Sequence, residues 1–188
     1  MKGALLVLGV IVLGVVIAGS YLFGVRNELV KEQNDIQGKW AQVDNDLKRR
    51  ADLIPNLVET VKGFAKQEQT VFGDIAAARS RLLNAPSPQK EIDANNQLTG
   101  ALGRLLVLQE RYPELKSNEN FQRLQDELSG TENRIAVSRR DYNEAITKYN
   151  TDIALFPKNL AASLFSFQRN DAYFKTTEQE RQVPTVKF

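Results

Sequence analysis

The chain lacks two residue types on which many active sites depend. None of its 188 residues is a cysteine or a histidine. Without cysteine there are no disulfides, thiol nucleophiles or iron–sulfur clusters, although reducing and oxidising compartments both contain such proteins. Without histidine the commonest general base near neutral pH is missing, and the usual zinc and copper sites cannot form. We therefore expect no catalytic residue, no cofactor and no metal site, and we predict that the protein is not an enzyme.

A strong net charge is also lacking. The 25 Lys and Arg residues nearly balance the 23 Asp and Glu residues. Such a chain has no broad positive field with which to hold a nucleic acid, so we expect no nucleic-acid partner. At 188 residues it has room for one domain of ordinary size.

One long uncharged run stands at the start of the chain. Residues 3–23 read GALLVLGVIVLGVVIAGSYLF. A helix of about 21 residues crosses a hydrocarbon core of roughly 30 Å. Lys2, Tyr21 and Arg26 flank the run with the basic and aromatic groups that are typical of membrane interfaces. We predict that residues 1–24 are a transmembrane anchor and that residues 3–23 contact the lipid bilayer.

Whether this segment is cleaved and on which side of the membrane it leaves the C-terminal domain are separate questions. The alternative is a signal peptide that is cleaved after the small residues Val16 and Ala18. The apolar part of a signal peptide is usually about 7–15 residues long, which favours an uncleaved anchor here. Arg26, Lys31 and Lys39 follow the run but are interspersed with acidic residues. Counting the basic residues alone favours a cytoplasmic C-terminal domain.

Apolar spacing predicts helices throughout the rest of the chain. Steps of three, four and seven residues run from Val25 to Leu47 and indicate an amphipathic helix. We expect this helix to end near residues 50–53, because Pro55 disfavours helical geometry before it and fits the first turn of a new helix. Pro55 should therefore mark a turn or a kink, and the second helix should continue to Leu83.

The second half of the chain contains the clearest helix. Proline-containing stretches delimit helices over residues 89–111 and 118–155, with Ser117 or Asn118 as the N-cap of the later one. A shorter apolar helix should follow Pro157. Residues 118–155 contain a heptad-like seam, which indicates packing within a bundle. The seam consists of Phe121, Leu124, Leu128, Thr131, Ile135, Ser138, Tyr142, Ala145, Tyr149 and Asp152.

Together these patterns predict an all-α fold. An N-terminal transmembrane helix is followed by an elongated antiparallel bundle of about four long helices. The bundle should cover residues 25–174, and residues 175–188 should form a polar C-terminal tail.

Two polar groups in the predicted bundle are candidates for a functional role. Glu68 falls within an apolar stripe, where a carboxylate needs a partner. It is either a structural ion pair with an arginine on a neighbouring helix, or a polar contact or catalytic acid. The cations of residues 48–50, beside Asp52, could hold an anionic headgroup or partner. Alternatively, they form ion pairs between helices or subunits.

Two tyrosine–asparagine pairs recur seven residues apart. They are Tyr142-Asn143 and Tyr149-Asn150. Each member therefore repeats on one helix face and could form a polar ladder that fixes the register of a seam. The alternative is that the tyrosines are ordinary core residues and the asparagines lie at its rim. Trp40 is expected to anchor the core.

Several motifs resemble the LemA family of bacterial membrane proteins. They are RRADLIPNLV at residues 49–58, VKGF at residues 61–64 and YPELK at residues 112–116. The resemblance implies a helical domain anchored in the bacterial cytoplasmic membrane, with no established catalytic activity. The family often has His-Glu in the second helix, whereas this chain has Gln67-Glu68. A titrating or metal-binding histidine is therefore absent there.

We expect a membrane-anchored structural or scaffold protein. It should self-associate, hold another membrane protein, or do both, through its long amphipathic helices. The alternatives are a regulatory module that binds a membrane protease or an anionic ligand, and a carboxylate-dependent enzyme. The candidate interaction or structural residues are Arg49, Arg50, Asp52, Asn56, Glu68, Tyr142, Asn143, Tyr149 and Asn150.

Overall fold

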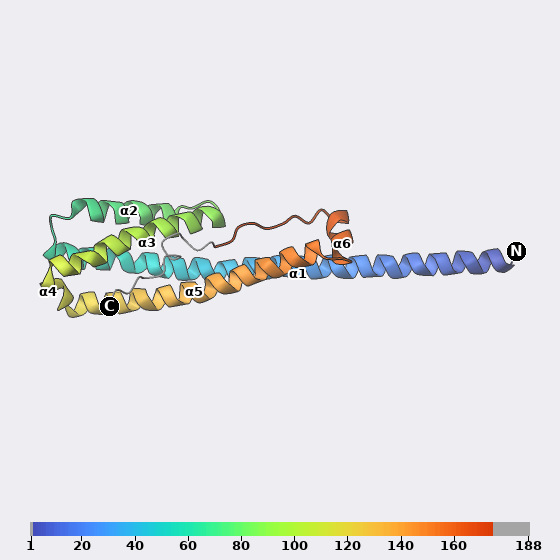
Figure 1. Cartoon of the computed structure of the whole chain (residues 1–188), viewed down its shortest axis with the longest axis horizontal. Helices are drawn as coiled ribbons and strands as arrows, with labels where there is room; N and C mark the ends of the chain where they lie inside the picture. The colour runs from blue at the N-terminus through green and yellow to red at the C-terminus, as the bar shows by residue number, and fades with distance from the viewer. Residues whose placement is uncertain (1, 175–188) are drawn as a thin grey trace, which may run out of the picture. The chain divides into compact units, whose positions relative to one another are not determined.

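The computed structural model describes residues 2–174, so the predicted polar tail lies outside the described residues (Figure 1). Helices and short connections make up this part of the chain, with no strand in it. The prediction of an all-α fold with a long apolar N-terminal helix is thereby confirmed. The helices are α1 (Lys2–Phe64), α2 (Gln69–Leu83), α3 (Pro88–Arg111), α4 (Pro113–Lys116), α5 (Glu119–Ala154) and α6 (Lys158–Leu164).

The chain divides into two compact units, and α1 and α5 contribute to both. The described part of the first unit comprises residues 2–39 and 142–171. The described part of the second unit comprises residues 40–141 and 172–174.

The helix α1 continues through Pro55, so the expected end near residues 50–53 and the expected turn at Pro55 were wrong. It runs for 63 residues with Pro55 inside it. A proline has no backbone N–H, so the carbonyl of Ala51 loses its usual partner in the helix. Arg79 replaces that partner by donating from Nε to the Ala51 oxygen at 2.8 Å. A tertiary contact therefore allows the helix to continue.

The break follows Phe64, at least eleven residues beyond the expected end at residues 50–53. After Phe64, the amide of Glu68 bonds to the carbonyl of Ala65 in a turn, and α2 begins at Gln69. The predicted helix over residues 55–83 is therefore divided in two, and Glu68 is the residue before α2, outside any helix. Phe64 is 39% exposed. Gly63 stands beside the break, and glycine is a poor helix former.

The later helices begin and end close to the predicted residues. Pro88 occupies the first turn of α3, because its missing N–H would have no partner there in any case. The Asn118 side chain caps α5 by accepting from the Phe121 amide at 3.0 Å. The short helix α4 was not predicted, and it places Leu115 in the core.

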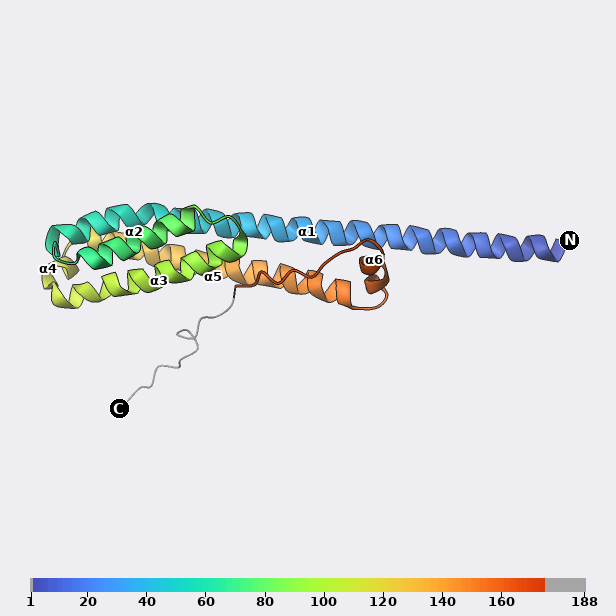
Figure 2. The same ribbon diagram turned by 90° about the horizontal axis from the view of Figure 1, so that it is seen from above.

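The core of the second unit is formed by apolar faces of α1, α2, α3 and α5. The helices α2 and α3 pack closely against each other (Figure 2). Burying one leucine side chain contributes about 1.5–3 kcal/mol. The fully buried large residues of this unit include Leu47, Ile54, Leu57, Ile75, Leu98, Leu105, Leu108, Leu115 and Phe121.

The first unit has a smaller core. Leu29 of α1, Tyr142 and Tyr149 of α5 and Ala161 of α6 are each at most 1% exposed. Tyr142 and Tyr149 belong to the heptad-like seam, as do the buried residues Phe121 and Ile135 of the second unit. The single chain therefore covers much of the seam.

The beginning of α1 differs from every other part of the structure. It contains a window of mean hydropathy 2.6, none of which is buried. Leu6 and Val10, for example, are 72% and 71% exposed. By length and composition α1 is the one helix among the described residues that could cross a membrane, although an N-terminal signal sequence has the same character. So large an apolar surface is unfavourable in water and indicates another medium or partner.

Candidate functional site

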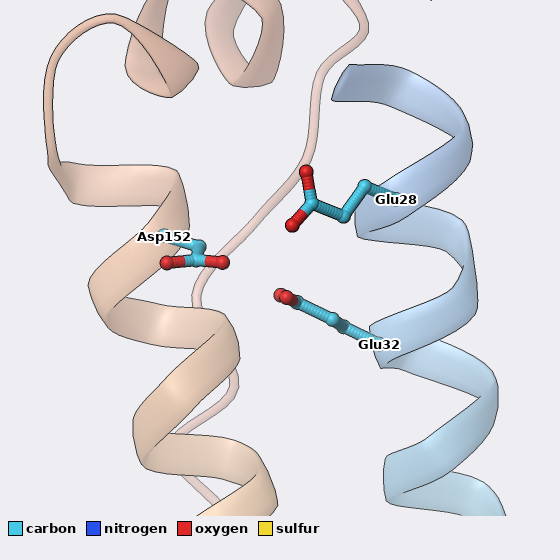
Figure 3. A group of neighbouring side chains, drawn as sticks. All are labelled: Glu28, Glu32 and Asp152. Carbon is cyan, nitrogen blue, oxygen red and sulfur yellow. The ribbon is translucent and has the colours of Figure 1, made fainter. Parts of the chain in front are cut away.

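Figure 3 shows three carboxylates of the first unit that point toward one another, Glu28 and Glu32 from α1 and Asp152 from α5. One oxygen atom of each carboxylate lies within 4.8 Å of one oxygen atom of each of the other two. Two lysines form ion pairs with them. Lys148 bonds to Glu32 and lies 3.6 Å from Asp152. Lys158 lies 2.7 Å from Glu28 and 2.6 Å from Asp152. Three carboxylates and two ammonium groups leave one negative charge in this network.

Burial and hydrogen bonds shift the pKa values of the network's members in different directions. Burial raises the pKa of Glu32, and this outweighs the hydrogen bond from Lys148. Burial also acts to raise the pKa of Asp152, but its hydrogen bonds with Lys158 and Glu32 bring it below the ordinary value. The hydrogen bonds to Asp152 and Glu28 raise the pKa of Lys158. The lysines therefore remain charged at neutral pH and act as the cations of the cluster.

Oxygen ligands of this kind suit Ca²⁺ or Mg²⁺. A divalent ion would have to displace the ammonium groups of Lys148 and Lys158, which already contact Glu28, Glu32 and Asp152. The chemistry present is thus that of an ion-pair network that joins α1 to α5.

Tyr149 and Asn150, two of the candidate residues, lie near this network and bind the segment that follows α6. The Tyr149 hydroxyl donates to the carbonyl of Gln168 at 2.9 Å and accepts from Gln33 at 3.0 Å. Asn150 makes two bonds to the backbone of Asn170, donating to its carbonyl at 2.7 Å and accepting from its amide at 2.9 Å. Both side chains fix the path of the chain after α6.

The two tyrosine–asparagine pairs have different environments. Tyr142 and Tyr149 are core residues, and burial raises the pKa of Tyr142 to about 12. Asn143 is partly exposed, whereas Asn150 is buried. The expected rim position therefore fits Asn143, and Asn150 has the internal position just described.

In the second unit the structure separates the residues of the predicted cationic cluster. Arg49 is exposed, as are Asp52 and Asn56. Lys48 is also exposed and pairs with Asp44 within α1 at 2.6 Å. Only Arg50 points inward. Successive residues of a helix differ by about 100° in direction, so neighbours in sequence need not form one patch.

Arg50 is 5% exposed and is bonded on several sides. It donates to Asn95 and to Thr99, each at 3.1 Å. Its guanidinium also lies 2.9 Å from Glu132. Burial lowers the pKa of Arg50, and the Glu132 carboxylate acts in the opposite direction. The group joins α1, α3 and α5.

A cavity of about 350 Å³ adjoins Arg50. Small-molecule sites range from about 300 to 1,000 Å³ and are largely apolar. The buried Nε of Arg50 has no hydrogen-bond partner in the structure. The polar lining residues of the cavity include Thr99, Gln125 and Ser129. Its apolar and small lining residues are Leu57, Leu102, Gly103, Leu106 and Leu128.

Glu68 lies apart from this cavity. Its Oε1 atom is 3.0 Å from Arg111 and 3.4 Å from the Tyr112 hydroxyl. Arg111 is the last residue of α3, so this ion pair joins α3 to the residue that precedes α2.

Two further polar pairs were not predicted from the sequence. Ser138 donates to Asp46 at 2.5 Å, and both residues are buried. Burial, together with the hydrogen bond and charge of Asp44, raises the pKa of Glu91 to about 7. The position of Asp46 beside the apolar stripe of α1 is the sequence signal that could have indicated its burial. The Asp44–Glu91 pair joins α1 to α3 and has no local sequence signature.

The sequence of the chain matches the LemA family over residues 39–188. The protein LemA of Metamycoplasma hominis is 28% identical over 159 residues, which covers 84% of this chain and 72% of that relative. The magnetosome protein MamQ 2 of Paramagnetospirillum magneticum is 30% identical over 175 residues, which covers 79% and 64%. MamQ of Magnetospirillum gryphiswaldense is 25% identical over 188 residues, which covers 86% and 69%.

The chain thus spans less than two thirds of the length of MamQ 2. The family match and the apolar start of α1 fit a membrane-anchored protein. Because the match covers residues 39–188, which is more than half of the chain, the protein belongs to the LemA family.

Proposed function

We propose that this protein is a membrane-anchored structural protein whose helical units hold partner proteins or further copies of the chain. The observation that carries the proposal is the continuity of α1. Its start is apolar and exposed, and the same helix extends to Phe64 without a break. The anchor is therefore joined to the remainder of the chain by helix.

The use of the polar residues also supports a structural role. Glu68 is bonded to Arg111, Arg50 to Asn95, and Asp46 to Ser138. The last two pairs each join two helices of the second unit, and the first joins the residue before α2 to α3. Buried polar groups that bond one another contribute to a specific packing arrangement.

Self-association through the heptad-like seam is disfavoured, because the chain itself buries Phe121, Ile135, Tyr142 and Tyr149. The apolar start of α1 provides a different surface. Gly3, Gly9, Gly14 and Gly19 are surrounded by open space. Small residues let membrane helices approach closely. We therefore place the contact with another copy, or with another membrane protein, along this segment.

Membrane anchoring can be tested in the full chain with charged substitutions. An arginine at the centre of a membrane helix opposes insertion by about 2.5–3.5 kcal/mol. The double variant Leu8→Arg/Val12→Arg should therefore leave the membrane fraction in a flotation gradient, whereas Leu8→Ile/Val12→Leu should float like the parent. Equal flotation of both variants would contradict the proposed anchor.

The membrane and its side form a further part of the proposal. We place the anchor in the bacterial cytoplasmic membrane and residues 25–188 in the cytoplasm, from the basic residues that follow the apolar run. The chain has no cysteine, so Ala77→Cys on the exposed side of α2 creates a unique label site. A membrane-impermeant maleimide should label it only in permeabilised cells. Labelling in intact cells would reverse the orientation.

A second candidate function is the binding of a small amphiphile in the cavity beside Arg50. Its leucine side chains, together with the polar groups of Thr99, Gln125 and Ser129, suit a ligand with an apolar body and a carboxylate or carbonyl acceptor. Gly103 lines the cavity, and Gly100 lies outside it on the same helix; added side chains meet open space at both. If the cavity binds decanoate, this probe should raise the Tm of the parent and of Gly100→Leu but not of Gly103→Leu. Equal shifts in all three would exclude binding in the cavity.

A further inference from the structure

The turn between α5 and α6, together with the short helix α6 itself, exposes four large apolar side chains. Phe156 is 78% exposed and Leu164 is 63% exposed. Leu155 and Leu160 are 58% and 57% exposed. We call these four residues the apolar foot. Single exposed apolar residues are common on soluble proteins, but a group of this size usually marks an interaction surface.

The segment that carries the foot lies at the end of the uncharged run. The Phe165 ring is 6.0 Å from the ring of Phe23, the last residue of that run. The guanidinium of Arg26 is 5.7 Å from the centre of the same Phe165 ring. Figures 1 and 2 both show α6 beside α1. The segment that carries the foot therefore adjoins the end of the proposed anchor.

The helix α6 has two unlike faces. Ala161 and Ala162 are buried, whereas Leu160 and Leu164 are directed outward. Lys158 at its start is held by Glu28 and Asp152. An apolar face with basic and aromatic groups beside it is typical of segments that lie in the membrane interface.

We propose that the apolar foot lies in the surface layer of the bilayer that contains the anchor. This inference rests on the proposed function, because the anchor determines where the bilayer surface lies. With Phe23 at the boundary of the apolar core, the ring contact with Phe165 brings α6 to the same level. Lipid covers the four side chains. The foot therefore holds the part of the first unit around α6 at the membrane surface.

The test uses single cysteines in the full chain, which has none of its own. A nitroxide is attached at Leu160→Cys, at Val12→Cys as the bilayer reference, and at Asn34→Cys as the aqueous reference. Asn34 is exposed on α1 and lies about 16 Å beyond Phe23 at 1.5 Å per residue. Each protein is reconstituted in phosphatidylcholine–phosphatidylglycerol vesicles. Collisions with oxygen, which concentrates in lipid, are compared with collisions with a water-soluble nickel complex.

If the foot lies in the surface layer of the bilayer, the label at position 160 has an oxygen-to-nickel collision ratio several-fold above that at position 34. A ratio equal to that at position 34, with position 12 in lipid, would overturn the foot and leave the anchor intact. Shielding from both reagents, with spin–spin broadening, would show that a second copy covers the foot and would also overturn it. A ratio at position 12 equal to that at position 34 would reject the anchor and the foot together.

Discussion

Arg79 donates from Nε to the carbonyl oxygen of Ala51 at 2.8 Å, and Ala51 lies four residues before Pro55. This is the oxygen that loses its partner in the helix because Pro55 has no N–H. Ala51 is fully buried, so water cannot replace the missing donor. A single side chain of α2 thus supplies the hydrogen bond that the proline removes from α1.

Replacing Arg79 should reveal this compensation. Arg79→Met keeps much of the side-chain length but leaves the Ala51 oxygen unsatisfied. A buried acceptor without a partner costs about 1–3 kcal/mol, and we expect the free energy of unfolding to fall by that amount. Denaturant unfolding of the detergent-extracted protein, followed by circular dichroism, measures it.

A double-mutant cycle provides the control. Pro55→Ala restores the backbone donor, so Arg79→Met should be less costly in that background. A coupling of about 1 kcal/mol between the two positions would agree with a shared oxygen. Equal losses in both backgrounds would show that Arg79 stabilises the fold in another way.

The pH dependence of the free energy of unfolding should reveal the raised pKa of Glu91. Burial and Asp44 raise its pKa from 4.5 to about 7. Between these values the folded protein binds a proton that the unfolded chain has released, so stability falls as the pH rises from about 4.5 to 7. Partial exposure limits the effect to about 1–2 kcal/mol. Glu91→Gln should flatten this part of the unfolding profile, and an unchanged slope would contradict the assignment.

Asn150 should control the segment after α6. Its side-chain oxygen accepts from the Asn170 amide at 2.9 Å, and its amide group donates to the Asn170 carbonyl at 2.7 Å. Asn150→Ala should accelerate hydrogen exchange at residue 170 by at least about tenfold, because a loss of about 1.4 kcal/mol has that effect. Thr151→Ala, at the exposed neighbouring position, is the matched control. Equal exchange rates in the two variants would argue against this role.

Removing the lysines should convert the carboxylate cluster of the first unit into a cation site. Lys148 and Lys158 occupy the places beside Glu32, Glu28 and Asp152 that a metal ion would take. We expect millimolar Ca²⁺ to raise the Tm of Lys148→Met/Lys158→Met by several degrees and to leave the parent unchanged. Stabilisation of the parent by Ca²⁺ to the same extent would show that the lysines do not fill the site.

Local sequence signals were sufficient for much of the fold. The boundaries of α3 and α5 follow from proline at a first turn and from the Asn118 cap, which act within a few residues. The apolar start of α1 follows from composition alone. The error at Pro55 arose because its compensation comes from Arg79, on a different helix.

The polar sites were harder to predict, because their members are distant in sequence. Lys148 and Glu32 are separated by 116 positions, and neither residue has a local motif that identifies the other. The inward direction of Arg50 follows from its position on α1, but the cavity beside it depends on the packing of α3 and α5. Such sites arise from tertiary structure.

The native mass of the full chain tests the central claim most directly. After extraction in mild detergent, light scattering with the detergent subtracted gives the mass of the protein alone. A membrane-anchored structural protein that holds copies or partners should give a defined mass that is a multiple of the 21.2 kDa chain, or a stable complex with another membrane protein. A mass of one chain, together with no cross-linked product in native membranes, would contradict the claim.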